Sequence, residues 1–115
     1  MNTAAMLEDL GHTVFEAASG KQALEILRQE ERVDLVITDQ AMPHMTGTQL
    51  AEAIRAERPN LAIILATGYA ELPPGTDARL PKLAKPFRQE DLSRAIAEVV
   101  RTKQATRPVL KVYGK

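Results

Sequence analysis

The fold of this chain can be worked out from Val33-Asp34-Leu35-Val36-Ile37-Thr38-Asp39. This short run of apolar, largely β-branched residues is followed by Gln40-Ala41-Met42-Pro43, and the pattern predicts a buried strand that ends in a loop. In open α/β sheets, ligands bind in the crevice at the carboxyl ends of the strands. Asp39, the last residue of the run, is therefore the first candidate for chemistry.

Composition limits the class of protein. The chain has 115 residues, of which 44% are hydrophobic, so one domain with one ordinary core is expected. Fifteen basic and fifteen acidic residues cancel, and this balance does not favour nucleic acid or an anionic membrane as a partner. The chain contains no cysteine, which fits a reducing compartment. Because it also lacks a long apolar run and the pattern of a signal peptide, we expect a cytoplasmic protein.

Helix and strand patterns alternate on both sides of the opening run. Toward the amino terminus, helical spacing predicts a helix that ends at Gly11, then a strand at 12–17 and a helix capped by Ser19. Toward the carboxyl terminus, Thr46 caps the next helix. The remaining expected elements are a buried strand at 61–67, a loop at 71–77, an edge strand at 80–85 and a helix at 90–100. Alternation of this kind predicts a doubly wound α/β fold with a parallel sheet.

Three polar residues come at the ends of three predicted strands: Asp39, Thr67 and Lys85. The carboxyl ends of parallel strands share one rim of the sheet, so these side chains are expected to converge there. A carboxylate can attack phosphorus and form an aspartyl phosphate, a hydroxyl can hydrogen-bond a phosphoryl oxygen, and a lysine can neutralise its charge. Each residue alone is explained more simply, as a strand-end or surface residue, but together they indicate phosphoryl chemistry.

These residues belong to motifs that resemble the response-regulator receiver domain of two-component signalling. The motifs are Asp39-x-x-Met42-Pro43 with Gly47, then Ala66-Thr67-Gly68, then Lys85-Pro86-Phe87. The resemblance implies a flavodoxin-like fold, Asp39 as the phosphate acceptor, Thr67 as a switch hydroxyl and Lys85 as the phosphate-binding lysine. It also implies a cis Lys85–Pro86 bond. A phosphorelay of this kind takes phosphate from a histidine kinase or phosphotransfer protein, and the receiver at most catalyses its own phosphotransfer and dephosphorylation.

The chain departs from the family pattern at two places. Receivers begin with a strand that ends in an acidic pair, and this pair helps to hold Mg²⁺. Here only Asp39 and the backbone carbonyl of Ala41 remain of the metal shell, which is too few ligands for octahedral Mg²⁺, so metal binding is expected to be weak or absent. In addition, Lys82 stands where the family usually has an aromatic switch residue, for which Tyr69 is a weak substitute.

The missing first strand leaves a gap between the predicted strands 12–17 and 33–39, where backbone groups would be unpaired. We divide the chain into a receiver domain at 1–100 and a basic tail at 101–115. Residues 108–113 have a strand pattern, and we hypothesise that they fill the gap, within one molecule or by exchange in a homodimer.

The general behaviour of chain ends instead favours a frayed tail. Burial of Val109 and Leu110 would decide between the two. An inserted strand would place Tyr113 and Gly114 where the acidic pair belongs, so Mg²⁺ affinity would not return.

Three functions stay open at this point. The first is a phosphoacceptor receiver that signals by protein contact. The second is a pseudo-receiver, an interaction module of the same fold that no longer takes phosphate. The third, a small α/β hydrolase, is disfavoured because the sequence has no Gly-x-Ser-x-Gly elbow.

Overall fold

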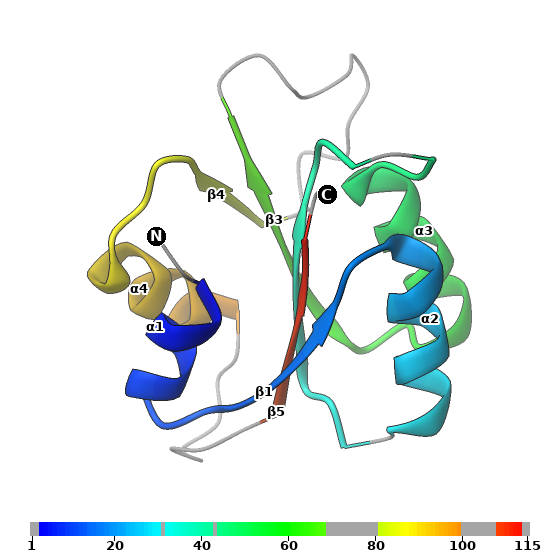
Figure 1. The fold of residues 1–115 in the computed structure, drawn as a ribbon, viewed down its shortest axis with the longest axis horizontal. Coiled ribbons are helices and arrows are strands. Elements are labelled where there is room, and N and C mark those ends of the chain that lie inside the picture. The colour runs from blue at the N-terminus through cyan, green and yellow to red at the C-terminus, as the bar shows by residue number, and fades with distance from the viewer. Residues whose placement is uncertain (1–2, 31, 43, 69–80, 100–107, 114–115) are drawn as a thin grey trace.

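The computed structural model describes residues 3–30, 32–42, 44–68, 81–99 and 108–113. The elements alternate as the sequence predicts, and Figure 1 shows them. In chain order they are α1 (Thr3–Asp9), β1 (Thr13–Ala17), α2 (Gly20–Gln29), β2 (Leu35–Asp39), α3 (Gly47–Glu57), β3 (Ala62–Thr67), β4 (Lys82–Ala84), α4 (Gln89–Val99) and β5 (Pro108–Val112). The predictions for Tyr69, for the loop at 71–77 and for Gly114 concern residues outside the described ranges.

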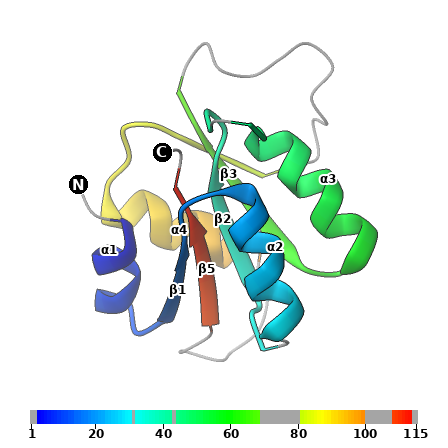
Figure 2. The same cartoon turned by 45° about the vertical axis from the view of Figure 1, so that its right-hand side comes forward.

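The five strands form one parallel sheet in the order β1-β5-β2-β3-β4. Helices α1 and α4 lie on one face of the sheet, and α2 and α3 lie on the other (Figures 1 and 2). This arrangement confirms the predicted doubly wound α/β fold, with β4 at the edge as Pro81 suggested.

Strand β5 fills the central gap, and the alternative of a frayed tail is wrong. It pairs in parallel with β1 on one side and β2 on the other, with Val109 opposite both Val14 and Leu35. Val109 and Leu110 are both 0% exposed. The strand comes from the same chain, so backbone pairing in the centre is complete without a second molecule. Exchange of this strand in a homodimer stays a prediction.

Local capping explains where two helices begin. The Ser19 hydroxyl accepts a hydrogen bond from the backbone N–H of Gln22 at the start of α2. At α3, Thr46 and Gln49 form a reciprocal capping box. Gly47 follows Thr46 directly, and a Cβ atom at this position would clash with the carbonyl oxygen of Asp39. Glycine therefore lets the start of α3 press against the end of β2.

Each face of the sheet has its own apolar core. One core packs the sheet against α2 and α3, and the other packs it against α1 and α4. The first includes Ala23, Leu27, Val36, Leu50, Ile54, Leu65, Leu110 and Val112. The second includes Leu7, Leu35, Ile37, Ile64, Phe87, Leu92, Ile96 and Val109. Alternate residues of β2 and β5 therefore serve opposite cores, as the two-residue period of a strand requires.

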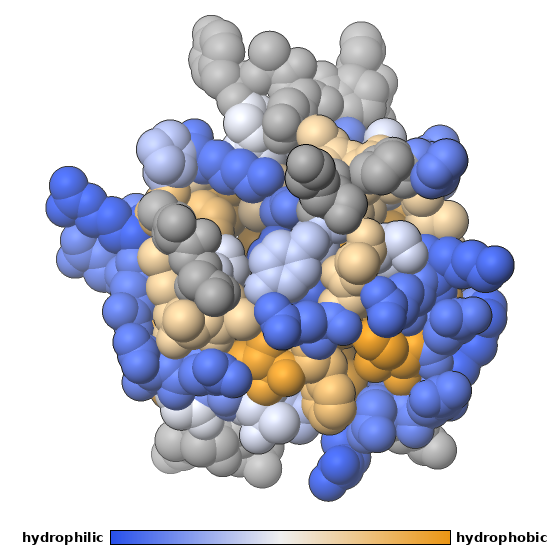
Figure 3. Space-filling model, viewed as in Figure 1, coloured by the Kyte–Doolittle hydropathy of each residue, from blue (hydrophilic) through white to orange (hydrophobic). Residues whose placement is uncertain are grey.

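Polar side chains cover much of the outside. On the face shown in Figure 3, hydrophilic side chains surround a smaller apolar area near β1 and α2. Arg28 of α2 holds Glu57 of α3 through two hydrogen bonds of 3.2 and 2.8 Å, which ties these helices together at the surface. None of the helices in the described part of the chain has the length and apolar character that a membrane crossing requires.

Candidate functional site

Asp39 lies at the carboxyl end of β2, at the rim where the sequence predicts the site. It is in register with Ala66 of β3, and the following N–H of Gln40 donates to the Ala66 carbonyl at 3.0 Å. These backbone bonds fix the end of the strand. The Asp39 side chain is 14% exposed, so its carboxylate is largely withdrawn from solvent yet reachable.

Lys85 approaches the carboxylate from the edge of the sheet. Its backbone N–H donates to the carbonyl of Thr67 at 3.0 Å, which holds the end of β4 beside the end of β3. Its Nζ lies 3.3 Å from Asp39 Oδ1, and its side chain is 37% exposed. The peptide bond between Lys85 and Pro86 is cis, as the family resemblance implied. The structure thus brings together two of the three predicted residues.

Thr67 ends β3, one residue beyond the register partner of Asp39. Its side chain is buried, and its hydroxyl donates to the carbonyl of Gly68 at 3.0 Å. Thr67 is on the same rim as the other two residues, but it is not among the described residues that line the cavity around them. Its role as a switch hydroxyl stays a prediction.

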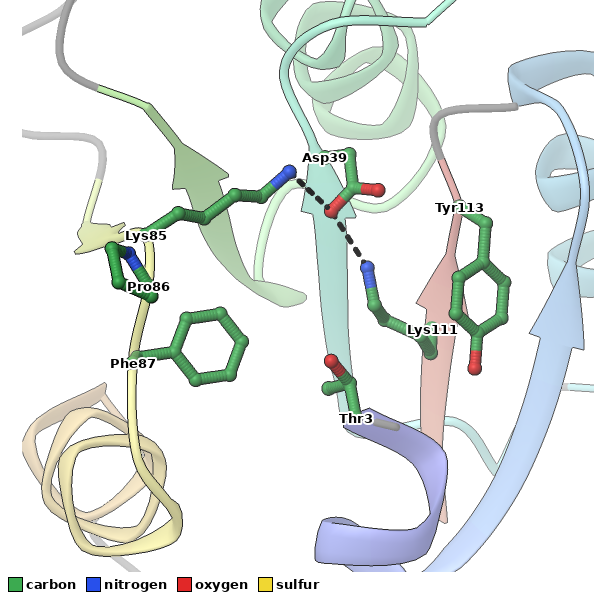
Figure 4. A pocket seen from close by; sticks show the side chains of 7 residues that line it. All are labelled: Thr3, Asp39, Lys85, Pro86, Phe87, Lys111 and Tyr113. Carbon is green, nitrogen blue, oxygen red and sulfur yellow. Dashed lines mark hydrogen bonds and ion pairs between the residues drawn. The ribbon is translucent and has the colours of Figure 1, made fainter. Parts of the chain in front are cut away.

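Lys111 of β5 is the residue that sequence reasoning missed. Its Nζ donates to Asp39 Oδ1 at 2.8 Å and to the carbonyl of Val112 at 3.0 Å, and it stands 4.8 Å from the ring centroid of Tyr113. The side chain is only 2% exposed. Figure 4 shows the two lysines reaching the Asp39 carboxylate from opposite sides.

The surroundings of Lys111 disfavour its charged form on balance. Burial lowers the pKa of Lys111 below its ordinary value of 10.5, and the hydrogen bond and charge of Asp39 act against this shift. The positive charge of Lys85 lowers the pKa further. An ammonium in the middle of a central strand therefore costs stability.

A signal for Lys111 was present in the sequence. A central strand of a parallel sheet is expected to be a continuous apolar run, and Lys111 interrupts Val109-Leu110-Lys111-Val112. Once the segment was placed between two strands, a lysine on the face that carries Asp39 required a buried partner. As one of several basic residues in a tail, Lys111 would need no such partner.

The residues around Asp39 do not fit Mg²⁺. Among the described residues, no group of three or more His, Cys, Asp or Glu side chains is placed to hold a metal ion. Tyr113 follows β5 at the first position expected for the acidic pair, so that position carries a phenol. Mg²⁺ bound to Asp39 Oδ1 at its usual distance of about 2 Å would stand within roughly 5 Å of the Lys111 ammonium. The two positive charges would repel each other at that separation, so the Lys111 ammonium opposes metal binding at Asp39.

A cavity of about 510 Å³ opens beside these groups. Its described lining is made by α1, by the ends of β2 and β5, and by the segment after β4, with the residues Thr3, Asp39, Lys85, Pro86, Phe87, Lys111 and Tyr113. The Tyr113 hydroxyl donates to Glu16 Oε2 of β1 at 2.5 Å. The ammonium groups of Lys85 and Lys111 flank the Asp39 carboxylate from opposite sides, and Pro86 and Phe87 add apolar lining, so the cavity suits a small anion next to a carboxylate.

This fold and this rim are those of a receiver-type signalling module, and comparison with known proteins agrees. The chain belongs to the response regulator receiver domain family, whose model matches residues 1–97. It is 33% identical over 90 residues to sporulation initiation phosphotransferase F of Bacillus subtilis, which covers 75% of this chain and 72% of that protein. It is also 36% identical over 98 residues to the receiver protein CpdR of Brucella abortus, covering 82% and 81% of the two chains.

A longer relative is the sensor kinase CckA of Brucella abortus, which is 39% identical over 101 residues. The match covers 82% of this chain and spans 10% of that kinase. Among solved structures, a receiver domain protein of Clostridium thermocellum superposes with a TM-score of 0.76 at 30% identity, covering 84% of this chain and 81% of that one. The receiver domain of the sensor histidine kinase PA1611 of Pseudomonas aeruginosa has a TM-score of 0.68 at 25% identity, covers 86% and 85%, and holds magnesium in its active-site cleft.

Proposed function

We propose that this receiver domain accepts a phosphoryl group on Asp39 from the phosphohistidine of a histidine kinase or phosphotransfer protein. The observation that supports this most strongly is the contact of one largely buried carboxylate with two lysine ammonium groups, at the carboxyl rim of a parallel sheet. This geometry provides a nucleophile and two charges that can hold a phosphoryl group.

The proposed reaction is a transfer between two covalent carriers. A carboxylate oxygen of Asp39 attacks phosphorus, an O–P bond forms, and the P–N bond to the donor histidine breaks. The electron pair of that bond goes to the ring nitrogen, so the imidazole leaves neutral if its other nitrogen carries a proton. Asp39 needs to be ionised for this step, and both lysines favour its ionised form.

The charge of the site suits an incoming phosphoryl group. With all three side chains ionised, Asp39, Lys85 and Lys111 carry one net positive charge. The family arrangement implied by the resemblance combines three carboxylates, one Mg²⁺ and one lysine, and is neutral. The site described here is therefore at least as favourable for a group that brings about two negative charges.

A pseudo-receiver is the second candidate, and one observation favours it. The Lys111 ammonium already donates a partly buried hydrogen bond to Asp39, so the carboxylate has a cation beside it before any donor binds. If this pair is too stable to admit a donor, the domain would act through protein contact in a single state. The two candidates predict opposite results in one experiment.

That experiment is phosphorylation by acetyl phosphate, followed by intact-mass measurement in the presence of either Mg²⁺ or EDTA. We expect the wild-type protein to gain the mass of one phosphoryl group and Asp39→Asn to gain none. Asp34→Asn is the matched control, because Asp34 is exposed just before the amino end of the same strand and should leave the adduct unchanged. No wild-type adduct in either condition would favour the pseudo-receiver.

A further inference from the structure

We propose that Lys111 is the resident cation of this site and takes the place of a divalent metal, so that the site excludes Mg²⁺ and works without it. The part of this inference that concerns reaction at Asp39 rests on the proposed function. The part that concerns metal exclusion does not, and it is tested separately.

The ammonium of Lys111 is held in place from several sides. It donates to the Asp39 carboxylate and to the carbonyl of Val112, and its charge lies against the Tyr113 ring. Tyr113 is in turn fixed by its hydrogen bond to Glu16 on the neighbouring strand. These contacts make Lys111 a built component of the site, with Tyr113 as a positioning residue.

The position of Lys111 in the sheet supports a functional role. It lies opposite Ile37 in β2, two residues before Asp39 at the rim, and its neighbours Val109, Leu110 and Val112 are fully buried. An apolar side chain at this position would satisfy the packing without a buried charge. A charged residue inside a buried central strand, where apolar residues are the norm, is expected at a functional site.

The two lysines approach the same carboxylate oxygen but differ in environment. Lys85 is 37% exposed and comes from the edge of the sheet, whereas Lys111 is 2% exposed and comes from its centre. The inner ammonium therefore provides a fixed charge at the base of the cavity, and the outer one can follow a phosphoryl group as it enters. Lys111 thus supplies the charge neutralisation that a metal ion would otherwise give.

The first test measures metal binding and does not depend on phosphorylation. Mg²⁺ is titrated while the amide resonances of Asp39 and Lys111 are followed by NMR. Wild-type protein should show no saturable shift at millimolar Mg²⁺. Tyr113→Asp supplies a second carboxylate with Lys111 still present, and Tyr113→Asp combined with Lys111→Met supplies it with the ammonium removed. We expect the double variant to bind Mg²⁺ at least about tenfold more tightly than Tyr113→Asp, because the like charge is gone.

The second test compares phosphorylation by acetyl phosphate with Mg²⁺ and with EDTA. Wild-type rates should agree within about twofold. Lys111→Met should slow adduct formation in EDTA by about a hundredfold, the size of effect seen when one stabilising group is removed from a charged transition state. Lys21→Gln is the control for loss of a lysine, because Lys21 is exposed on α2. Its rate should equal that of the wild type.

The outcomes separate the inference from the proposed function. Saturable Mg²⁺ binding by the wild type, or equal affinity of Tyr113→Asp and the double variant, would overturn metal exclusion whether or not Asp39 is phosphorylated. An adduct that forms only with Mg²⁺ would confirm the acceptor role and refute the role of Lys111. No adduct in either condition refutes the acceptor role, and the titration still decides metal exclusion. Retained dispersion of the amide resonances shows that each variant is folded.

Discussion

Strands β2 and β5 are neighbours in the centre of the sheet, yet they carry their charged residues differently. Both are buried between the two helical layers, and they pair in parallel from Leu35 and Val109 onward. Strand β2 carries no charge until its last residue, Asp39, which reaches the rim. Strand β5 carries Lys111 within its buried length, and only the long side chain brings the ammonium to the rim.

This difference between β2 and β5 shows how one sheet can combine a stable centre with a charged site. The Asp39 carboxylate at the strand end is still 14% exposed and is paired with two ammonium groups, so β2 carries it at a lower cost. A lysine inside a strand is desolvated along its whole length, so β5 gives up stability to place a cation. In both strands, the other buried residues supply the packing.

Removal of β5 should have the largest effect. Burial of Val109, Leu110 and Val112 stabilises the fold by roughly 1.5–3 kcal/mol for each side chain. Their sum is comparable with the whole stability of a small domain, about 5–15 kcal/mol. We expect deletion of residues 108–115 to abolish cooperative thermal unfolding, as monitored by circular dichroism.

A peptide test sharpens this prediction. A synthetic peptide of residues 108–115 added to the truncated chain should restore a cooperative transition, and a scrambled peptide of the same composition should not. If the truncated chain melts like the full-length protein, β5 is not needed for the fold. Strands β2 and β5 would then not be equivalent central strands.

Replacement of the buried charge should have a smaller effect of opposite sign. Lys111→Met keeps most of the packing volume and removes an ammonium whose burial lowers its pKa, while Asp39 keeps Lys85 as a partner. We therefore expect the free energy of unfolding in urea at pH 7 to rise by about 1–3 kcal/mol. Lys21→Gln should change it by less than about 0.5 kcal/mol. A loss of stability in Lys111→Met would mean that the pair with Asp39 stabilises the fold.

Most of the fold could be predicted from the sequence because its signals are local. The apolar run before Asp39, the capping residues Ser19 and Thr46, and the proline before β4 each act within a few residues. The place of β5 could only be hypothesised, because it depends on a gap between β1 and β2 that no short window of sequence contains. Completion of backbone pairing outweighed the usual disorder of a chain end.

The site was predictable to a lesser extent. Asp39 and Lys85 follow from strand ends that share one rim, and the structure places them 3.3 Å apart. Lys111 could not be assigned, because its role depends on the register of β5 against β2, which sets which face of the sheet it joins. A shift of one residue would have placed it on the α2 and α3 side.

The smallest expected effect concerns Tyr113, which lines the cavity beside Lys111. Burial, together with the hydrogen bond and charge of Glu16, raises the pKa of Tyr113 to about 12, above its ordinary value of 10.0. A group with a raised pKa stabilises the folded state fully below its unfolded pKa and loses that contribution as pH rises to its folded pKa. The stability that Tyr113 provides should therefore be constant up to about pH 10 and decline between about pH 10 and pH 12.

The measurement is the urea midpoint of wild-type protein and Tyr113→Phe at several pH values across that window. Other groups titrate there too, so the informative quantity is the difference between the two proteins. Phenylalanine keeps the ring against Lys111 and removes the ionisable hydroxyl, so the wild type should lose more stability than the variant as pH rises. Parallel pH profiles of the two proteins would show that the Tyr113 hydroxyl is not held by Glu16 in solution. In that case only packing of the Tyr113 ring would connect β1 to Lys111.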